Sequence, residues 1–256
     1  MIILEKHQPQ KITTAVFDFD GTLSTLRCGW ETVMAPMMTE YLSNGTPTDE
    51  IIESVNKYID ESTGIQTIIQ MKWLAAEVER RTGIKRDPWF YKDEYNARLM
   101  KSVALRRDEA KSGQREKYLI KGSEKFLASL KEKDIKLFAA SGTDEVDVKK
   151  EADALGISGY FDLIAGAGVR SENCSKEETL KRLITSGVGG IIVIGDGPVE
   201  IKLGRAFGTL TLGVAADEKR LCGYSDAKIS RLTAAKAHAL CDSFENTDEI
   251  LGWMED

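Results

Sequence analysis

The sequence has few of the residues that mark disulfide-rich, zinc-binding or membrane proteins. It contains only four cysteines in 256 residues, far apart at Cys28, Cys174, Cys222 and Cys241, and none belongs to a C-x-x-C pair. Such spacing predicts free thiols in a reducing compartment and disfavours a zinc site. There is no apolar run of about 18 residues, the length that spans a membrane. The first residues, MIILEKHQPQK, also lack the apolar core and small-residue cleavage site of a signal peptide. We therefore expect a cytoplasmic protein.

Positively charged residues are fewer than negatively charged ones. Lys and Arg number 35 against 41 Asp and Glu, which gives a formal net charge of −6 and a pI near 5.3. Such a surface repels phosphate backbones and anionic membranes on average, so we expect no nucleic-acid or membrane partner, although a local basic site for a small anion remains open. Hydrophobic residues make up 42% and charged residues 30%, as in an ordinary globular protein with a real core. The length fits one large domain, or one domain with an insertion.

Short apolar runs of strand length alternate with amphipathic helical stretches over most of the chain. The predicted strands cover 13–19, 135–141, 161–167, 190–196 and 208–214. The predicted helices cover 123–133, 144–156, 176–187 and 198–208. Strands alternating with helices of about 10–15 residues indicate right-handed βαβ units, so the fold class is α/β with a doubly wound parallel sheet. Residues 214–244 are expected to hold the final strand, a helix and a short returning segment, and no chemistry is assigned to them.

One interval, from Thr25 to Leu119, breaks this alternation. It reads as amphipathic helices, such as GIQTIIQMKWLAAEVERRTG, with turns between them and no convincing buried strand. An insertion directly after the first strand lies at a strand end, where α/β proteins place their sites. We therefore predict a core of residues 1–24 and 120–256, and a helical cap domain of residues 25–119 that covers the active site.

Two aspartates in the segment AVFDFDGTLST stand directly after the first predicted strand. In an extended segment Asp18 and Asp20 point the same way, and two carboxylates facing one space repel each other unless a cation, a proton or a hydrogen-bond donor intervenes. A calcium loop does not fit, because with Gly21 at its sixth position Val16 and Arg27 would occupy ligand positions. The pair therefore implies another partner.

Two later segments offer groups that bind anions. In AASGT, Ser141 and Thr143 lie at a strand-to-helix junction, where a hydroxyl and free backbone N–H groups cradle an anion or merely cap a helix. In SKEETLKRL, Ser175 and Glu178 match a capping box that places Lys176 at the first helical position. A cation there opposes the helix dipole but suits an anion held in front of the helix. Lys176 is therefore the predicted phosphate ligand, and Lys181 is the weaker candidate.

A third segment, IIVIGDGPVE, ends another strongly apolar strand. Asp196 follows the strand, and Glu200 lies one helical turn further on. Glu200 occupies the position where a dinucleotide-binding fingerprint needs glycine, which argues against nucleotide binding, and Ser171 does the same in the partial match GAGVRS. A cluster of Asp18, Asp20 and Asp196 suits Mg²⁺, a hard ion that is shared with phosphate oxygens.

These segments, taken in order, resemble the haloacid dehalogenase (HAD) superfamily of phosphohydrolases. The four motifs correspond to DFDGT, Ser141 in AASGT, Lys176 and GDGPVE, and they extend over a Rossmann-like core. The insertion between the first two motifs resembles the helical C1 cap of the phosphoglycolate phosphatase and β-phosphoglucomutase branch.

The resemblance implies a role for each motif residue. Asp18 is the nucleophile that becomes an aspartyl-phosphate, and Asp20 is the general acid and then the base. Mg²⁺ is held by the Asp18 carboxylate, the Asp20 backbone carbonyl and Asp196. The phosphoryl group is bound by Ser141, Gly142 and Lys176, and supporting contacts come from Glu200, Thr22 and Thr143.

The motifs also narrow the reaction to phosphoryl chemistry. Dehalogenases proper lack the second aspartate, and phosphonoacetaldehyde hydrolases use a cap lysine where this chain offers Arg27. The leading hypothesis is a Mg²⁺-dependent phosphatase that hydrolyses a small phosphate monoester, such as a sugar phosphate or similar metabolite. A phosphomutase of the β-phosphoglucomutase type and a non-catalytic binding protein with the same fold are the alternatives, and the protein is expected to be a monomer or a homodimer.

The sequence also offers candidates for the cap residues that contact substrate. The candidates are Arg27, Trp30, Gln66, Gln70 and Lys72. For Trp30 and Trp73 the alternative is packing in the core of the cap, where Met34, Met37 and Met38 are also expected.

Overall fold

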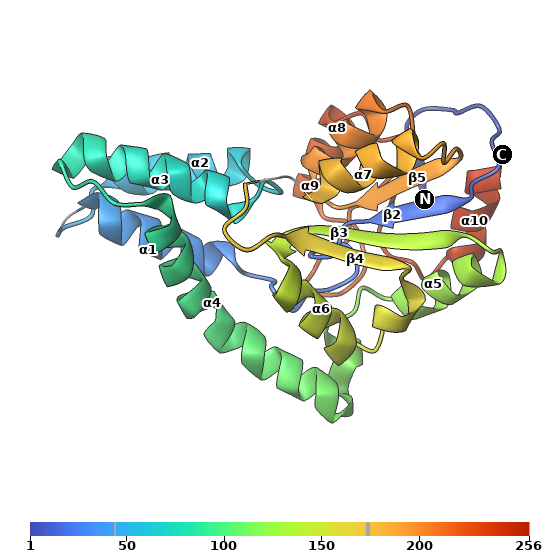
Figure 1. Cartoon of the computed structure of the whole chain (residues 1–256), viewed down its shortest axis with the longest axis horizontal. Helices are drawn as coiled ribbons and strands as arrows, with labels where there is room; N and C mark the ends of the chain where they lie inside the picture. Colours follow the sequence, from blue (N-terminus) through green and yellow to red (C-terminus); the bar gives the residue numbers. More distant parts are fainter. Residues whose placement is uncertain (44, 173–174, 256) are drawn as a thin grey trace.

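The computed structural model describes residues 1–43, 45–172 and 175–255, with the side chain of Ser175 excepted. Cys174 and the capping-box hydroxyl of Ser175 therefore lie outside the described residues. The described chain contains a seven-stranded sheet in the order β1-β7-β6-β5-β2-β3-β4 (Figure 1). The strands are β1 (Ile2–Ile3), β2 (Thr14–Phe17), β3 (Lys136–Asp144), β4 (Leu163–Ala167), β5 (Ile191–Gly195), β6 (Leu210–Val214) and β7 (Ala239–Cys241). All neighbouring strands are parallel except β1, which pairs antiparallel with β7.

The central strands are apolar because both faces of the sheet are covered. Every residue of β2, β5 and β6 is buried, as expected for a parallel sheet between two layers of helices. The predicted α/β class is confirmed, and each predicted strand has a counterpart in the sheet. One difference is that β3 continues to Asp144, beyond its predicted end at residue 141, so the segment AASGT is part of the strand. The other is the short strand β1, which the sequence did not predict.

Helices lie on both faces of the sheet. They are α5 (Ser123–Glu132), α6 (Glu145–Ala154), α7 (Ser175–Thr185), α8 (Pro198–Ala206), α9 (Asp226–Ala234) and α10 (Thr247–Glu255). Apolar residues of α5, α6 and α10 join one hydrophobic cluster with the sheet, whereas residues of α7, α8 and α9 belong to two other clusters. This is the doubly wound arrangement.

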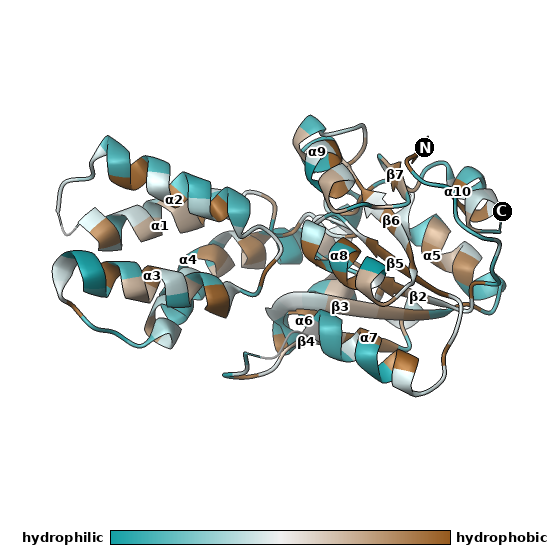
Figure 2. Cartoon of the chain, turned by 90° about the horizontal axis from the view of Figure 1, so that it is seen from above, coloured by the Kyte–Doolittle hydropathy of each residue, from teal (hydrophilic) through white to brown (hydrophobic). Residues whose placement is uncertain are grey.

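The inserted residues form a separate bundle of helices at one end of the sheet (Figures 1 and 2). The bundle, called the cap below, contains α1 (Glu31–Ser43), α2 (Asp49–Glu61), α3 (Thr67–Thr82) and α4 (Pro88–Glu109). A π-helical turn (Ala110–Gln114) and a 3-10 turn (Arg115–Lys117) then lead back to the sheet. No helix of the described chain is both long and apolar enough to cross a membrane.

The cap has a hydrophobic core of its own. Met34, Met37 and Met38 are fully buried in it, and Trp30 and Trp73 pack against it, as the packing alternative for these tryptophans predicted. Thioethers and aromatic rings fill such a core because they adapt to irregular gaps.

The two crossings between sheet and cap lie side by side. Ser24 forms β-bridges with both Asp20 and Leu119. Thr25 N–H donates to the carbonyl of Tyr118 at 2.8 Å. These contacts agree with the predicted domain boundaries at 24/25 and 119/120, which stay a prediction.

We expect the cap to lose stability separately from the sheet. Met71→Ala removes a fully buried side chain of α3 and should cost about 2–5 kcal/mol through the lost burial and the cavity. Hydrogen exchange followed by mass spectrometry should show faster exchange in α1–α4 and unchanged protection in β2 and β5. Ile69→Ala, in the same helix but 39% exposed, is the control and should change exchange little. Equal loss of protection in sheet and cap would contradict this prediction.

Candidate active site

The predicted site residues meet at the carboxyl edge of three neighbouring strands. β5, β2 and β3 are adjacent in the sheet. Asp196 and Asp18 directly follow β5 and β2, while Ser141 lies within β3. Because parallel strands point the same way, these side chains gather at one edge. Lys176 joins them from the first turn of α7.

A pocket of about 370 Å³ lies between this edge and the cap. The predicted core residues that line it are Asp18, Asp20, Ser141, Gly142, Thr143, Lys176 and Asp196. Lys181, the weaker phosphate candidate, instead pairs with Glu177 on the exposed face of α7. The structure therefore brings the motif residues together around one cavity.

Lys176 is a buried cation shared by two carboxylates. Its Nζ lies 3.0 Å from Asp18 Oδ1 and 2.8 Å from Glu200 Oε2. Burial alone would lower the pKa of Lys176, but the two carboxylates outweigh it and hold that pKa above its usual range. Burial raises the pKa of Asp18 well above its usual range, against the charge of Lys176. A further cation beside Asp18 would therefore favour the ionised carboxylate.

Glu200 links this pair to the start of α8. Its Oε1 accepts a hydrogen bond from the backbone N–H of Gly197 at 2.6 Å, while its Oε2 holds Lys176. Pro198 opens the helix, where a missing N–H costs nothing. One carboxylate thus caps α8 and orients the ammonium of Lys176.

Asp20 is held through only one of its carboxylate oxygens. Oδ2 accepts hydrogen bonds from the hydroxyl of Ser141 at 3.1 Å and from that of Thr143 at 2.8 Å. Oδ1 is buried and has no hydrogen-bond partner within the described chain. Arg27 Nε lies 3.8 Å from this oxygen. One oxygen of Asp20 is therefore fixed, and the other faces a cation without a hydrogen bond.

Asp196 is surrounded by donors, two of which the sequence did not predict. Thr22 Oγ1 donates to Oδ1 at 3.3 Å. Lys228 Nζ lies 2.8 Å and Arg231 Nη2 3.3 Å from Oδ2. Burial favours a higher pKa for Asp196, but Lys228 and Arg231 outweigh it and hold that pKa below its usual range. Asp196 is therefore an anion in this site.

Lys228 and Arg231 belong to α9, in the stretch that was expected to carry no chemistry. Both line the pocket, and Lys228 also pairs with Glu218 at 2.9 Å and donates to the carbonyl of Gly21 at 3.1 Å. The signal in the sequence is only a pair of cations three residues apart, which share one helix face. That signal does not say which carboxylate they meet.

Gly21 lets the chain pass close to Asp196. Its φ of +74° is unfavourable for other residues. A Cβ at this position would lie 2.4 Å from Asp196 Oδ2. The turn after Asp20 therefore needs glycine both for its backbone and for the space of the neighbouring carboxylate.

The donor set fits the Mg²⁺ that the family resemblance implies. Carboxylate oxygens of Asp18, Asp196 and Glu200 lie within 4.8 Å of one another and are buried. Hard oxygen ligands of this type suit Mg²⁺, which commonly uses one or two carboxylates together with substrate phosphate. The structure adds Glu200 to the expected carboxylates, while Asp20 directs its side chain to Ser141 and Thr143.

Comparison with known families decides the classification. The family described as haloacid dehalogenase-like hydrolase matches residues 12–208. The chain belongs to the haloacid dehalogenase-like hydrolases. This match confirms the predicted family and the predicted class of enzyme. No curated protein matches the chain.

Solved structures share the whole fold of this HAD-like hydrolase at low sequence identity. β-Phosphoglucomutase from Clostridium difficile superposes with a TM-score of 0.64 at 18% identity, over 95% of this chain and 97% of that chain. A predicted phosphatase from Clostridium acetobutylicum gives a TM-score of 0.63 at 18% identity, over 94% and 100%. A predicted phosphoglycolate phosphatase from Haemophilus somnus gives 0.58 at 15% identity, over 94% and 99%. These structural similarities support the assignment of the fold as a core with an inserted helical cap.

The cap residues predicted to contact substrate in this HAD-like hydrolase differ in whether they line the pocket. Trp30 and Gln70 line the pocket, and Gln70 Nε2 donates to Ser62 Oγ at 3.0 Å. Gln66 is buried where the cap meets Gly142, since a Cβ on that glycine would lie 3.9 Å from Gln66 Cα. Lys72 pairs with Glu172, outside the pocket lining.

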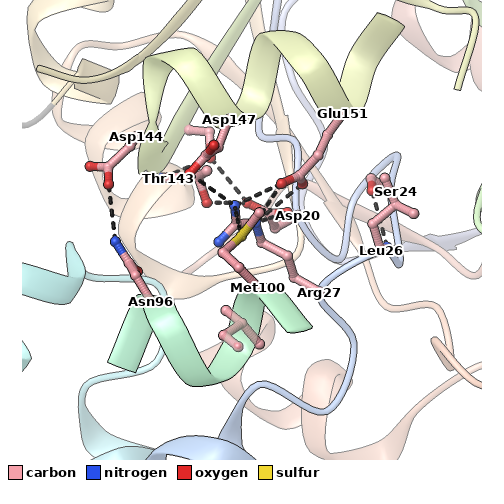
Figure 3. Close-up of polar contacts among 12 residues, drawn as sticks. Asp20, Ser24, Leu26, Arg27, Asn96, Met100, Thr143, Asp144, Asp147 and Glu151 are labelled. Carbon is pink, nitrogen blue, oxygen red and sulfur yellow. Dashed lines mark hydrogen bonds and ion pairs between the residues drawn. The ribbon is translucent and has the colours of Figure 1, made fainter. Parts of the chain in front are cut away.

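Arg27 lines the pocket but turns its charge into the core. Its guanidinium binds Glu151 of α6, with Nη2 2.7 Å from Oε1 and Nε 3.1 Å from both oxygens (Figure 3). Glu151 is fully buried. Burial raises the pKa of Glu151 to about 7, although the charge of Arg27 opposes the rise.

This raised pKa predicts a dependence of stability on pH. The folded state binds the Glu151 proton more tightly than the unfolded chain, whose glutamates titrate near pH 4.3. The contribution of this group to stability is therefore present at low pH and is lost as the pH rises toward 7, by up to about 3 kcal/mol. Glu151→Gln removes the titration, so the variant should gain stability relative to wild type between about pH 5 and 7.5.

Urea unfolding of both proteins at these two pH values measures the effect. The control is Glu124→Gln, which breaks a half-exposed ion pair with Arg115 outside the pocket. A stability difference between Glu151→Gln and wild type that stays constant with pH would show that Glu151 is ionised throughout this range.

Proposed function

We propose that the protein hydrolyses a small phosphate monoester, with Asp18 as the nucleophile and an aspartyl-phosphate as the intermediate. The observation that carries the proposal is the shared pocket of Asp18, Asp20, Ser141 and Lys176 under a helical cap. A carboxylate that attacks phosphorus needs a nearby cation and a separate proton donor. In this proposal Lys176 is the cation, and Asp20 is the proton donor.

Lys176 and the segment Ser141–Thr143 bind the phosphoryl group in this proposal. Lys176 already contacts Asp18 Oδ1, so an oxygen of a phosphate beside Asp18 is within reach of its ammonium. The hydroxyl of Ser141 and the backbone around Gly142 face the same pocket. Positioning and charge neutralisation of this kind supply most of the catalysis in phosphoryl transfer.

Asp18, Asp196 and the backbone carbonyl of Asp20 would hold Mg²⁺, with Glu200 as a supporting carboxylate. When bound, the ion would offset the charge repulsion between carboxylate and phosphate. Thr22, Lys228 and Arg231 keep Asp196 fixed and ionised for that purpose.

Asp20 would act as the general acid and then as the general base. Its Oδ1 is buried, so Oδ2, which accepts hydrogen bonds from the hydroxyls of Ser141 and Thr143, is the oxygen that would deliver a proton to the leaving group. The same oxygen would then accept a proton from the water that attacks the aspartyl-phosphate.

The substrate is proposed to be small because the pocket lies between the sheet edge and the cap and has a limited volume. Its volume of about 370 Å³ suits a sugar phosphate or a similar metabolite. Transfer of the phosphoryl group to water, rather than back to a sugar, is the proposed outcome. Product analysis with and without a bisphosphate primer separates this reaction from that of a phosphomutase.

Removal of the nucleophile or of the metal should abolish turnover. In a screen of sugar phosphates, phosphoglycolate and nucleotides, Asp18→Asn should lower kcat/KM by about 10³-fold or more, because the covalent step is lost. EDTA should abolish the wild-type activity, and Mg²⁺ should restore it. Full activity of Asp18→Asn, or turnover without metal, would rule out this mechanism. Mg²⁺ binding without turnover of any ester would favour a binding protein.

A matched pair of glycine variants tests the metal site directly. Gly21→Ala places a methyl group against Asp196, whereas Gly29→Ala has a similar φ of +82° and no atom closer than 3.8 Å. Both variants carry the backbone strain, but only the first should weaken Mg²⁺ binding, by about tenfold or more if one ligand is displaced. Calorimetric titration with Mg²⁺ measures this. Equal affinities of the two variants would place the metal elsewhere.

A further inference from the structure

The cap side of the pocket carries a carboxylate that helix stability does not explain. Asp60 lies in the last turn of α2, lines the pocket, and has no ion pair or hydrogen bond within the described residues. A carboxylate at the carboxyl end of a helix opposes the helix dipole, and the last turn of α2 has no basic residue to offset it. Glu31 also lines the pocket, but it lies in the first turn of α1, where a carboxylate stabilises the helix.

The amide of Gln70 presents a second acceptor at the same end of α2. Its Nε2 donates to the hydroxyl of Ser62 at 3.0 Å and to the Ser62 carbonyl at 3.4 Å. Because a carbonyl can only accept, the nitrogen is the end of the amide that faces Ser62, and Oε1 points away from it. Oε1 has no hydrogen-bond partner within the described chain and is not fully shielded from solvent. Gln70 is only 3% exposed and lines the pocket, so Oε1 is an acceptor open to the cavity.

Tyr95 adds a hydroxyl without a partner. It belongs to α4, is 4% exposed and lines the pocket. Its hydroxyl makes no hydrogen bond within the described residues, although it is not fully shielded from solvent. The hydroxyl of Tyr91, one turn earlier in α4, also lacks a partner, but it is completely buried and lies outside the pocket lining. Since a buried phenol normally finds a hydrogen-bond partner, the hydroxyl of Tyr95 is available to a ligand in the pocket.

The cations of the pocket lie elsewhere. Lys176, Lys228 and Arg231 come from α7 and α9 on the sheet side. Arg27 precedes α1, but its guanidinium is bound by the buried Glu151. Helices α1–α4 contribute no cation to the pocket lining within the described residues. A second anionic group on a substrate, on the side away from the phosphate, would therefore meet acceptors and a carboxylate.

We propose that the alcohol part of the substrate carries hydrogen-bond donors and no negative charge, and that Asp60, Gln70 and Tyr95 bind it. The donors are hydroxyl groups of a polyol or the ammonium group of an amino alcohol. The same wall discriminates against esters that carry a carboxylate or a second phosphate, because it places like charge opposite them. The inference rests on the proposed function, since it concerns the part of the ester that lies beyond the phosphate.

Pairs of esters that differ in one charged group test this inference. Phosphoglycolate, 3-phosphoglycerate and 6-phosphogluconate each have a counterpart in which CH2OH replaces the carboxylate. These counterparts are 2-hydroxyethyl phosphate, glycerol 3-phosphate and sorbitol 6-phosphate. In each pair, kcat/KM of the wild type should be about tenfold or more higher for the alcohol, because like charges that face each other in a binding site are strongly unfavourable.

A third ester, 2-aminoethyl phosphate, separates the two kinds of donor. A kcat/KM above that of 2-hydroxyethyl phosphate would assign the donor as an ammonium group, and a lower value would assign it as a hydroxyl. In both cases phosphoglycolate should be the poorest substrate of the three.

Variants of the cap wall connect this preference to its residues. Asp60→Asn should narrow the ratio of kcat/KM within each pair by about tenfold, mainly by improving the carboxylate member. Glu53→Gln, at an exposed position of the same helix outside the pocket lining, is the control and should leave the ratio unchanged. Tyr95→Phe should lower kcat/KM for the alcohols by about threefold to tenfold, the value of one hydrogen bond. Tyr91→Phe removes a hydroxyl outside the pocket lining and should have no effect.

Equal kcat/KM within the pairs, or a preference for the carboxylates, would overturn the inference, and so would a wild-type ratio in Asp60→Asn. Where turnover is too slow to compare, calorimetric binding of the same esters to Asp18→Asn decides, and the alcohol must bind more tightly than its carboxylate counterpart. Failure of the proposed function has another signature, because the wild type would then hydrolyse no ester of the whole screen or would not need Asp18.

Discussion

The structure depends on neutralising the carboxylates that the sheet brings to one edge. Asp18, Asp20, Asp196 and Glu200 share a small, mostly buried space, and two like charges 4 Å apart cost about 4 kcal/mol even at an effective dielectric constant of 20. Each carboxylate is matched with a cation from another element. Lys176 serves Asp18 and Glu200, Lys228 and Arg231 serve Asp196, and Arg27 stands beside Asp20. Arg27 and Lys228 also pair with Glu151 and Glu218, so these four cations are shared among more than four carboxylates.

These cations differ in the protein carboxylates that they contact. Lys228 and Arg231 bind Asp196, and Arg27 binds Glu151, so their donors hold the protein itself. Lys176 instead bridges Asp18 and Glu200. A phosphate beside Asp18 would exchange one of these contacts for its own oxygen. In the proposed reaction, the cation that holds these two carboxylates would also bind the substrate.

The sequence predicts the core of this site because its signals are local. Asp18 and Asp20 are separated by one residue, and each motif follows an apolar strand, so parallel topology alone brings the motifs together. The contacts of Glu151, Lys228 and Arg231 could not be predicted in this way. Each lies in an ordinary amphipathic helix, and its partner is more than 30 residues away, at Arg27 or Asp196. Only packing of α6 and α9 on the sheet selects these partners. The extension of β3 to Asp144 was missed for a related reason, since Asp144 pairs with Ala167 of β4 only after a shift of register beyond Ala140.

The sheet side and the cap contribute different kinds of residue to the pocket. The cations that line the pocket are Lys176, Lys228, Arg231 and Arg27 within the described residues, and none comes from helices α1–α4. Within the described residues, the cap wall offers no cation. It contributes Trp30, Gln70 and Tyr95, together with two acidic residues, Glu31 and Asp60. In the proposed reaction, the phosphate would therefore be bound on the side of the sheet, while the cap would contact the rest of the ester. Because these cap groups act through shape and hydrogen bonding over short distances, changes in the cap wall can alter which ester is accepted without disturbing the charge balance on which the strand edge depends.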